Sequence, residues 1–212
     1  QVLPAPRSKE RGVFLAFGFK RDNSGLYVVS DRDGEFSELS LYRFANRRWT
    51  CVTGHIPWDI GGGSITEDGK LLALRANVEG RDELHLFDAR TLKELAPPAV
   101  PPGSIRAAGF HRQRGELAFS MSNAKGPSQI LSMNPATGAV ETWTRPHAPA
   151  GVDTAGFSEP RTIRWPSFDG RTISGLLTLP PERHSGPRPV LVLIHGGPEG
   201  QAKMGFLSRY NY

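Results

Sequence analysis

Short apolar runs separated by polar turns dominate the first two thirds of the chain. Three stretches share the pattern of a turn followed by an apolar run: "GFKRDNSGLYVVSD", "SITEDGKLLALRA" and "GFHRQRGELAFSMS". The turns are built on Gly25, Gly69 and Gly115. Runs of this length, bounded by glycine and polar residues, are typical of β-strands. The pattern therefore predicts a mostly β structure.

The spacing of these runs predicts a repeat. Tyr27, Leu72 and Leu117 follow one another at intervals of 45 residues, and Leu39 and Leu84 in the next run are also 45 apart. A polar loop such as "NVEGRD" joins the two runs of a unit, and a third run follows, as in "WTCVT". A period of about 45 residues with three to four short strands is the signature of β-propeller blades. We predict about three blades in the first 150 residues, with a generic β-sandwich as the alternative.

The last sixty residues follow another pattern and predict a second domain over 151–212. Several prolines interrupt the chain near residue 150, which is typical of a domain boundary. The stretch "RTIRWPSFDGRTISGLLTL" has two strand-like runs around Asp169-Gly170, a strong hairpin signal. The apolar run Val190–Ile194 predicts a strand buried on both faces, as in a parallel sheet. This order is typical of the N-terminal part of an α/β-hydrolase domain, and "MGFLSRYNY" would approach its first helix.

Blade-like repeats followed by "PSFDGRTISGLL" and "LVLIHGGPEGQ" resemble the prolyl oligopeptidase family of serine peptidases, in its acylaminoacyl-peptidase-like branch with an HGGP loop. The resemblance implies a propeller that caps the active site and an acyl-enzyme mechanism on short peptides or acyl-peptides, with no metal and no other cofactor. It also implies that an N–H of the HGGP loop belongs to the oxyanion hole. Gly197 is the expected donor and Gly196 gives the turn its freedom, while His195 and Pro198 shape the loop.

A serine nucleophile is not found in the chain. A hydrolase of this type carries Ser on a GxSxG elbow, followed by Asp and His. Ser64 and Ser158 come nearest, each with a glycine two residues before it but none two residues after. We therefore expect the triad after Tyr212 and further blades before Gln1, since propellers close on four to eight blades. The chain alone should be inactive; a non-catalytic propeller that binds another protein and an α/β-hydrolase esterase remain as alternatives.

Composition and charge exclude several other classes. The net charge is +5, but the basic residues are scattered, so we expect no nucleic-acid binding. No segment approaches the roughly 18 consecutive apolar residues of a membrane span. Cys51 is the single cysteine, and the histidines lack a spacing such as HExxH, so we expect neither an intrachain disulfide nor a metal site. The compartment stays open, with the cytoplasm favoured, and a homo-oligomer is one option for the assembly.

Overall fold

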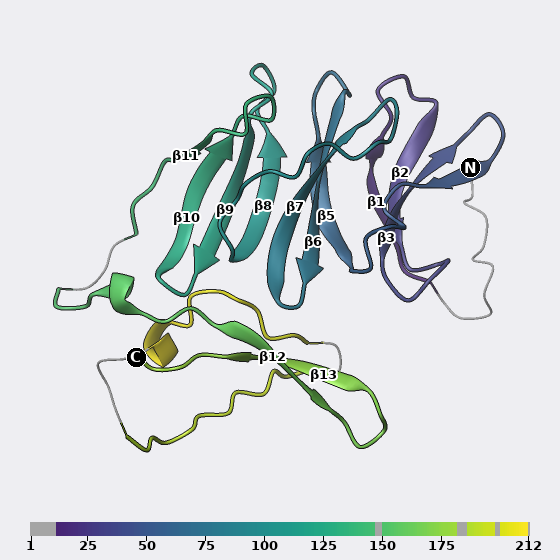
Figure 1. Cartoon of the computed structure of the whole chain (residues 1–212). Helices are drawn as coiled ribbons and strands as arrows, with labels where there is room; N and C mark the ends of the chain where they lie inside the picture. Colours follow the sequence, from purple (N-terminus) through teal and green to yellow (C-terminus); the bar gives the residue numbers. More distant parts are fainter. Residues whose placement is uncertain (1–11, 147–149, 182–185, 198–199, 212) are drawn as a thin grey trace.

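Three sheets and a hairpin make up the structure. The computed structural model describes residues 12–146, 150–181, 186–197 and 200–211. Within these ranges all sheets are antiparallel and there is no α-helix. The three sheets stand face to face in chain order, and the hairpin lies across one end of them (Figure 1).

Each sheet is an up-and-down arrangement of consecutive strands. The first contains β1 (Phe14–Phe19), β2 (Gly25–Ser30), β3 (Glu38–Arg43) and β4 (Arg48–Cys51). The second contains β5 (Ile60–Ile65), β6 (Leu71–Val78) and β7 (Arg81–Asp88). The third contains β8 (Ser104–Phe110), β9 (Leu117–Asn123), β10 (Gly126–Met133) and β11 (Val140–Thr142). Antiparallel meanders of this kind are the building unit of a propeller. The predicted repeat units are therefore confirmed as three blade-like sheets.

The second sheet has three strands because its fourth is cut short. After β7 the chain returns only as far as an isolated bridge between Phe87 and Glu94, made by bonds from the Asp88 N–H to the Lys93 carbonyl and from the Leu95 N–H to the Leu86 carbonyl. The sequence then continues as "PPAVPP". Proline has no N–H to donate to a neighbouring strand, so a longer edge strand cannot form there.

Two apolar cores lie between the sheets. The core between the first and second sheets holds buried residues of both, namely Tyr27, Val29, Leu39, Leu41, Leu72, Leu74, Ala76 and Phe87. The core between the second and third holds Ala73, Leu84, Leu86, Ile105, Leu117, Phe119, Met121, Leu131 and Met133. Alternate residues of β6 thus serve different cores, because successive side chains of a strand point to opposite faces.

The equivalence of Tyr27 with Leu72 and Leu117 is wrong by one residue. The strand pairs Phe19–Leu26, Ile65–Leu72 and Phe110–Leu117 close the three β-hairpins in the same way, so Leu26 is the true counterpart. Tyr27 therefore points to the opposite face, where its hydroxyl donates to the Ala89 carbonyl of the second sheet at 3.1 Å. A shift of one residue reverses the face of a strand residue. The spacing of Leu39 and Leu84 holds, and both are buried.

The turn before β2 also differs from the prediction. Gly69 and Gly115 have positive φ angles of 66° and 69°, but in the first sheet Asn23 takes this conformation, with φ of 54°. Gly25 instead begins β2, where a Cβ would lie 2.7 Å from the Tyr42 carbonyl oxygen. Glycine is needed at position 25 for close strand packing rather than for the turn.

The first strand of each sheet carries a β-bulge. The extra residue is Phe17 in β1, lies within Gly61–Gly62 in β5 and is Ala107 in β8. A bulge bends a strand and increases its local twist. The same irregularity therefore recurs in every repeat, although the residues at it share no chemistry.

The predicted hairpin in the last sixty residues is confirmed. It pairs β12 (Arg161–Pro166) with β13 (Thr172–Leu177) across a turn in which Gly170 has a φ of 82°. The buried strand predicted over Val190–Ile194 is wrong for this structure: these residues form no strand, and their exposed fractions run from 52% to 86%. A strand forms only beside a hydrogen-bonded neighbour, and no described strand lies beside this run.

The remaining ordered elements are two short 3₁₀ helices, η1 (Thr154–Gly156) and η2 (Ser208–Asn211). The second falls where the chain was expected to approach its first helix. The last strand of the blade-like sheets ends at Thr142 and β12 begins at Arg161. The predicted division into domains near residue 150 falls in the connection between them and stays a prediction.

Candidate functional site

The HGGP loop lies after the exposed apolar run. Gly197 has a φ of 75°, and a Cβ at Gly196 or Gly197 would meet no atom within 4 Å. Within the described residues neither amide donates a hydrogen bond. Pro198 lies outside the described residues. The backbone here is open enough for a ligand atom to approach it, as an oxyanion hole requires.

The loop is closed at its base by Gly200. A Cβ at Gly200 would lie 2.8 Å from Nδ1 of His195 and would also contact the Gly196 carbonyl oxygen. The ring of His195 therefore packs against the backbone at Gly200. Only glycine leaves room for this approach, so Gly200 lets the chain pass close to His195.

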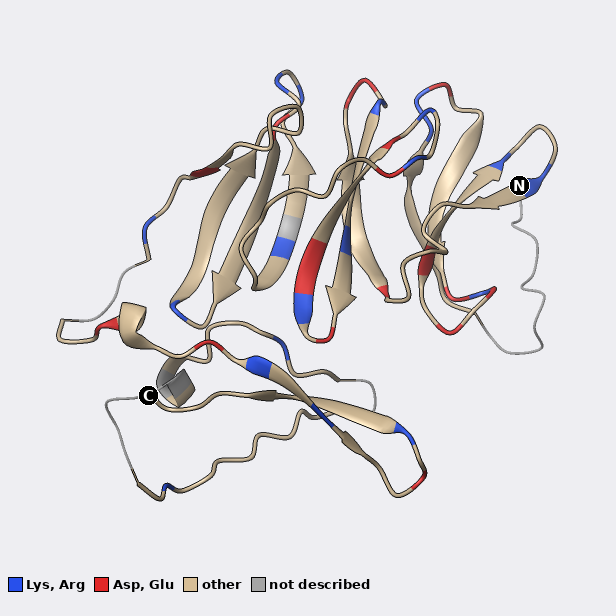
Figure 2. Ribbon diagram, in the orientation of Figure 1, with Lys and Arg blue, Asp and Glu red and all other residues tan. Residues whose placement is uncertain are grey.

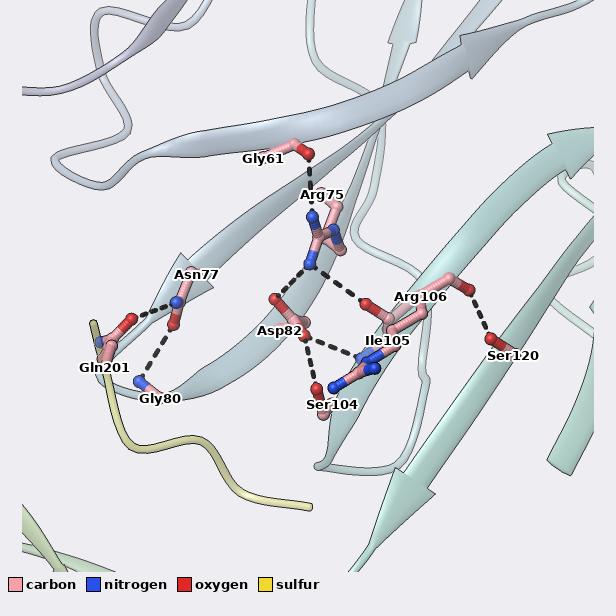
Figure 3. Close-up of polar contacts among 10 residues, drawn as sticks. All are labelled: Gly61, Arg75, Asn77, Gly80, Asp82, Ser104, Ile105, Arg106, Ser120 and Gln201. Atoms are coloured by element: carbon pink, nitrogen blue, oxygen red, sulfur yellow. Dashed lines mark hydrogen bonds and ion pairs between the residues drawn. The ribbon is translucent and has the colours of Figure 1, made fainter. Parts of the chain in front are cut away.

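The chain that follows the loop is bound to the hairpin between β6 and β7. The Met204 N–H donates to the Gly80 carbonyl at 2.7 Å. The side-chain amide of Asn77 donates to Oε1 of Gln201, as Figure 3 shows. A backbone bond and a side-chain bond therefore join a blade-like sheet to residues 201–204.

Local sequence explains the shape of this hairpin. Val78 pairs with Arg81, and the two residues between them, Glu79 and Gly80, have φ angles of 51° and 90°. Two consecutive positive φ angles define a type I′ turn, the form that matches the twist of paired strands. Oδ1 of Asn77 accepts the Gly80 N–H at 3.1 Å and stabilises the turn.

The hairpin end also contacts the β12–β13 hairpin. Arg164 of β12 donates from Nε to Oε1 of Glu79 at 2.8 Å, and its Nη2 also contacts the same carboxylate. A Cβ at Gly80 would lie 2.8 Å from the Ala202 carbonyl oxygen and 3.5 Å from a Leu176 methyl group. The end of β6–β7 thus fits between the second hairpin and residues 201–204.

Close to the end of the β6–β7 hairpin, the ion pair of Arg75 and Asp82 joins the second sheet to the third. Arg75 of β6 donates to Asp82 of β7 at 3.1 Å and to the Ile105 carbonyl of β8 at 3.1 Å. Asp82 is buried and accepts the Ile105 N–H at 2.8 Å and the Ser104 hydroxyl at 3.2 Å (Figure 3). A buried carboxylate of this kind is stable only when its oxygens are bonded.

Sequence reasoning missed this contact between the blades and the last segment. The sequence pattern predicts only a polar loop at "NVEGRD", although Gly80 between two apolar runs indicates a turn. The partners Asn77 and Gln201 are 124 residues apart, and no local pattern indicates their pairing.

Other charged groups are dispersed over the molecule. Figure 2 shows acidic and basic residues interspersed on the loops at both ends of the three sheets. In the part of the chain that the structure describes, no three His, Cys, Asp or Glu side chains are arranged to hold a metal ion. No described helix has the length and apolar character needed to cross a membrane.

Comparison with known proteins gives a fold likeness. No protein-family model and no curated protein matches the chain. A puromycin-hydrolysing peptidase of Mycobacterium tuberculosis superposes with a TM-score of 0.77 at 21% identity, over 95% of this chain and 32% of its own. One of two prolyl endopeptidases analysed for inter-domain dynamics gives 0.63 at 16%, over 80% and 26%. Prolyl oligopeptidase B of Galerina marginata gives 0.63 at 15%, over 78% and 23%.

At these identities the likeness is one of fold. The chain spans about a third or less of the length of these solved peptidases. It is structurally similar to part of prolyl oligopeptidase family peptidases, and its sheets resemble part of their propeller region.

Proposed function

We propose that this chain is part of a serine peptidase of the prolyl oligopeptidase family, in the branch that resembles acylaminoacyl peptidases. One observation carries the proposal: the fold match covers 95% of the chain. The blade strands end at Thr142, so a match of this extent includes much of the segment that contains the HGGP motif. The match therefore extends beyond the blade-like sheets into the last sixty residues, which supports the proposal.

The HGGP loop supplies the oxyanion donor in this proposal. When a nucleophile attacks a carbonyl group, the oxygen becomes negatively charged, and fixed N–H donors stabilise it by several kcal/mol. Gly197 is our candidate donor because its amide is unbonded within the described residues and its surroundings are open. Gly196 lets the backbone turn, and His195 and Pro198 shape the loop.

The two parts of the chain have separate roles. Residues 1–150 would form part of the propeller that caps the site and admits short peptides or acyl-peptides. Residues 151–212 would begin the hydrolase domain, in which Val190–Ile194 becomes a buried strand once its neighbours are present. No serine of this chain has the GxSxG pattern, so the nucleophile would come from outside these residues. Reaction through an acyl-enzyme needs no metal or organic cofactor.

Labelling of the intact natural protein with a fluorophosphonate probe tests the proposal. We expect one serine outside residues 1–212 to be labelled. We also expect release of p-nitroaniline from acetyl-aminoacyl p-nitroanilides and from short peptidyl p-nitroanilides. A folded protein that neither labels nor cleaves would favour a non-catalytic propeller that binds another protein. Cleavage of p-nitrophenyl esters but not of anilides would favour an esterase.

A further inference from the structure

We propose that the end of the β6–β7 hairpin positions the HGGP loop. We call residues 77–80 the β6–β7 tip. The tip holds residues 201–204 and, through them, the amide of Gly197. The catalytic consequence rests on the proposed function, whereas the positioning itself concerns only contacts within this chain.

The tip is a fixed support. Asn77 uses both ends of its side-chain amide: the oxygen accepts the Gly80 N–H, and the nitrogen donates to Gln201. Gly80 uses its carbonyl oxygen to bind Met204. Glu79 adds the ion pair to Arg164 of the second hairpin. The tip therefore contacts two segments of the last sixty residues at once.

The support extends from residue 201 to the loop. Gly200 immediately precedes Gln201 and packs against His195 and the Gly196 carbonyl oxygen. A shift of residue 201 would therefore change how Gly200 packs against His195 and the Gly196 carbonyl oxygen, next to Gly197. Misplacement of a catalytic group by about 1 Å can lower a rate by about 100-fold.

The tip is also tied to the third sheet. Arg75 and Asp82 lie on the same hairpin, close behind the tip, and both bond to residue 105 of β8. The position of the loop would then depend on how the second and third sheets pack. The second and third sheets would then position the donor amide of Gly197 as well as cover the active site.

The neighbouring hairpin offers a matched control. Asn123, close to the β9–β10 turn, accepts the Lys125 N–H at 3.0 Å, much as Asn77 accepts the Gly80 N–H. Among the described residues its side chain forms no hydrogen bond with residues 200–205. Asn123→Ala thus removes a comparable turn bond without removing a hydrogen bond to the last segment.

Hydrogen exchange on the intact natural protein tests the positioning. We expect Asn77→Ala and Gln201→Ala each to raise exchange of the Met204 amide by about tenfold, and the double variant to add little, because both remove the bond between Asn77 and Gln201. Asn123→Ala should leave that amide unchanged. Unchanged exchange in Asn77→Ala, or an equal rise in Asn123→Ala, would overturn the proposal.

Kinetics separates this proposal from the proposed function. If the protein is a peptidase, Asn77→Ala should lower kcat by about tenfold with KM nearly unchanged, because the loop acts on the transition state. An active protein whose kcat is unaffected would overturn the catalytic role of the tip. A protein without peptidase activity but with the expected exchange pattern would contradict the proposed function and leave the support of residues 201–204 by the tip established.

Discussion

Asp82 and Ile105 lie on different blade-like sheets, and the carboxylate of Asp82 accepts the Ile105 N–H at 2.8 Å. Arg75 completes the link, because its guanidinium bonds both to Asp82 and to the Ile105 carbonyl. It also reaches the Gly61 carbonyl of β5 at 2.8 Å. Strands from two sheets are thus joined by polar groups at the end of the molecule that faces the last sixty residues (Figure 3).

Replacement of Asp82 should destabilise the protein strongly. Asp82→Ala leaves Arg75 without its acidic partner and leaves the Ile105 N–H without an acceptor, which we expect to lower the free energy of unfolding by about 3 kcal/mol. Urea denaturation followed by tryptophan fluorescence measures this. Glu83→Ala on the same strand is the control: Glu83 forms a surface pair with Arg81, so the change should be below about 1 kcal/mol. Similar losses in both variants would contradict the structural role of Asp82.

Alanine at Gly80 should cost more than alanine at a comparable turn glycine. Gly80 and Gly138 both have positive φ, at 90° and 71°, so each substitution adds backbone strain of about 1 kcal/mol. Only at Gly80 would the new Cβ meet another segment, 2.8 Å from the Ala202 carbonyl. We expect Gly80→Ala to lower the melting temperature further and to expose residues 201–204 to limited proteolysis. Equal effects of the two variants would show that Ala202 is not packed on the turn.

The Cys51 thiol should react slowly with alkylating agents. Burial of the sulfur, and then its hydrogen bond to Glu38 at 3.1 Å, raise the pKa of Cys51 to about 11. Because the thiolate is the reactive form, alkylation at pH 8 should be about 100-fold slower than for a thiol with a pKa of 9, and should rise up to about pH 11.

The Glu38 contribution can be separated from burial. Glu38→Gln removes the negative charge beside the sulfur, so the pKa of Cys51 should fall and the rate of reaction with iodoacetamide at pH 8 should rise several-fold. Mass spectrometry of the modified peptide measures the rate. Glu35→Gln is the matched control, since Glu35 is exposed and no contact with Cys51 is present. A rate in Glu38→Gln equal to that of the natural protein would contradict the prediction.

The exposed apolar run should behave in opposite ways in two contexts. Val192 lies in the run Val190–Ile194, which is largely exposed in this structure. In the 212-residue polypeptide made alone, Val192→Lys should increase the soluble fraction because it interrupts an apolar, β-prone segment. In the intact natural protein the same substitution should lower the melting temperature, because the run would be a buried strand there.

Val13→Lys controls for the added charge, since Val13 is exposed and outside the run. It should change solubility less than Val192→Lys does. If the intact protein tolerates lysine at position 192 without loss of melting temperature, the run is not a buried strand and the proposed hydrolase domain is contradicted.

The repeat and the second hairpin could be predicted because their signals are local. Gly69 and Gly115 mark turns between apolar runs, and Asp169-Gly170 marks the β12–β13 turn. The face of each strand was harder to predict. Tyr27 and Leu72 are both buried, but they point into the same core from opposite sheets. Burial pattern and spacing alone do not distinguish a residue from its neighbour when both sides of a strand are covered.

The candidate site could be predicted only in part. The HGGP motif is continuous in sequence, so Gly196 and Gly197 could be identified directly. The contacts that support the loop include the hydrogen bond between Asn77 and Gln201. This bond forms only when the blade-like sheets and the last sixty residues fold together. The strand predicted over Val190–Ile194 shows the same limit, because apolar character indicates a buried strand only when the neighbouring strands are present.

The bulges at Phe17, Gly61–Gly62 and Ala107 bear on how such a chain arose. Three strands that each accommodate one surplus residue at nearly the same point are most simply copies of a single ancestral unit that already had the irregularity. What the copies retain is backbone register, while the side chains at the bulge have diverged to phenylalanine, glycine and alanine. The three repeats are therefore more alike in their strand pairing than in the amino acids at their bulges.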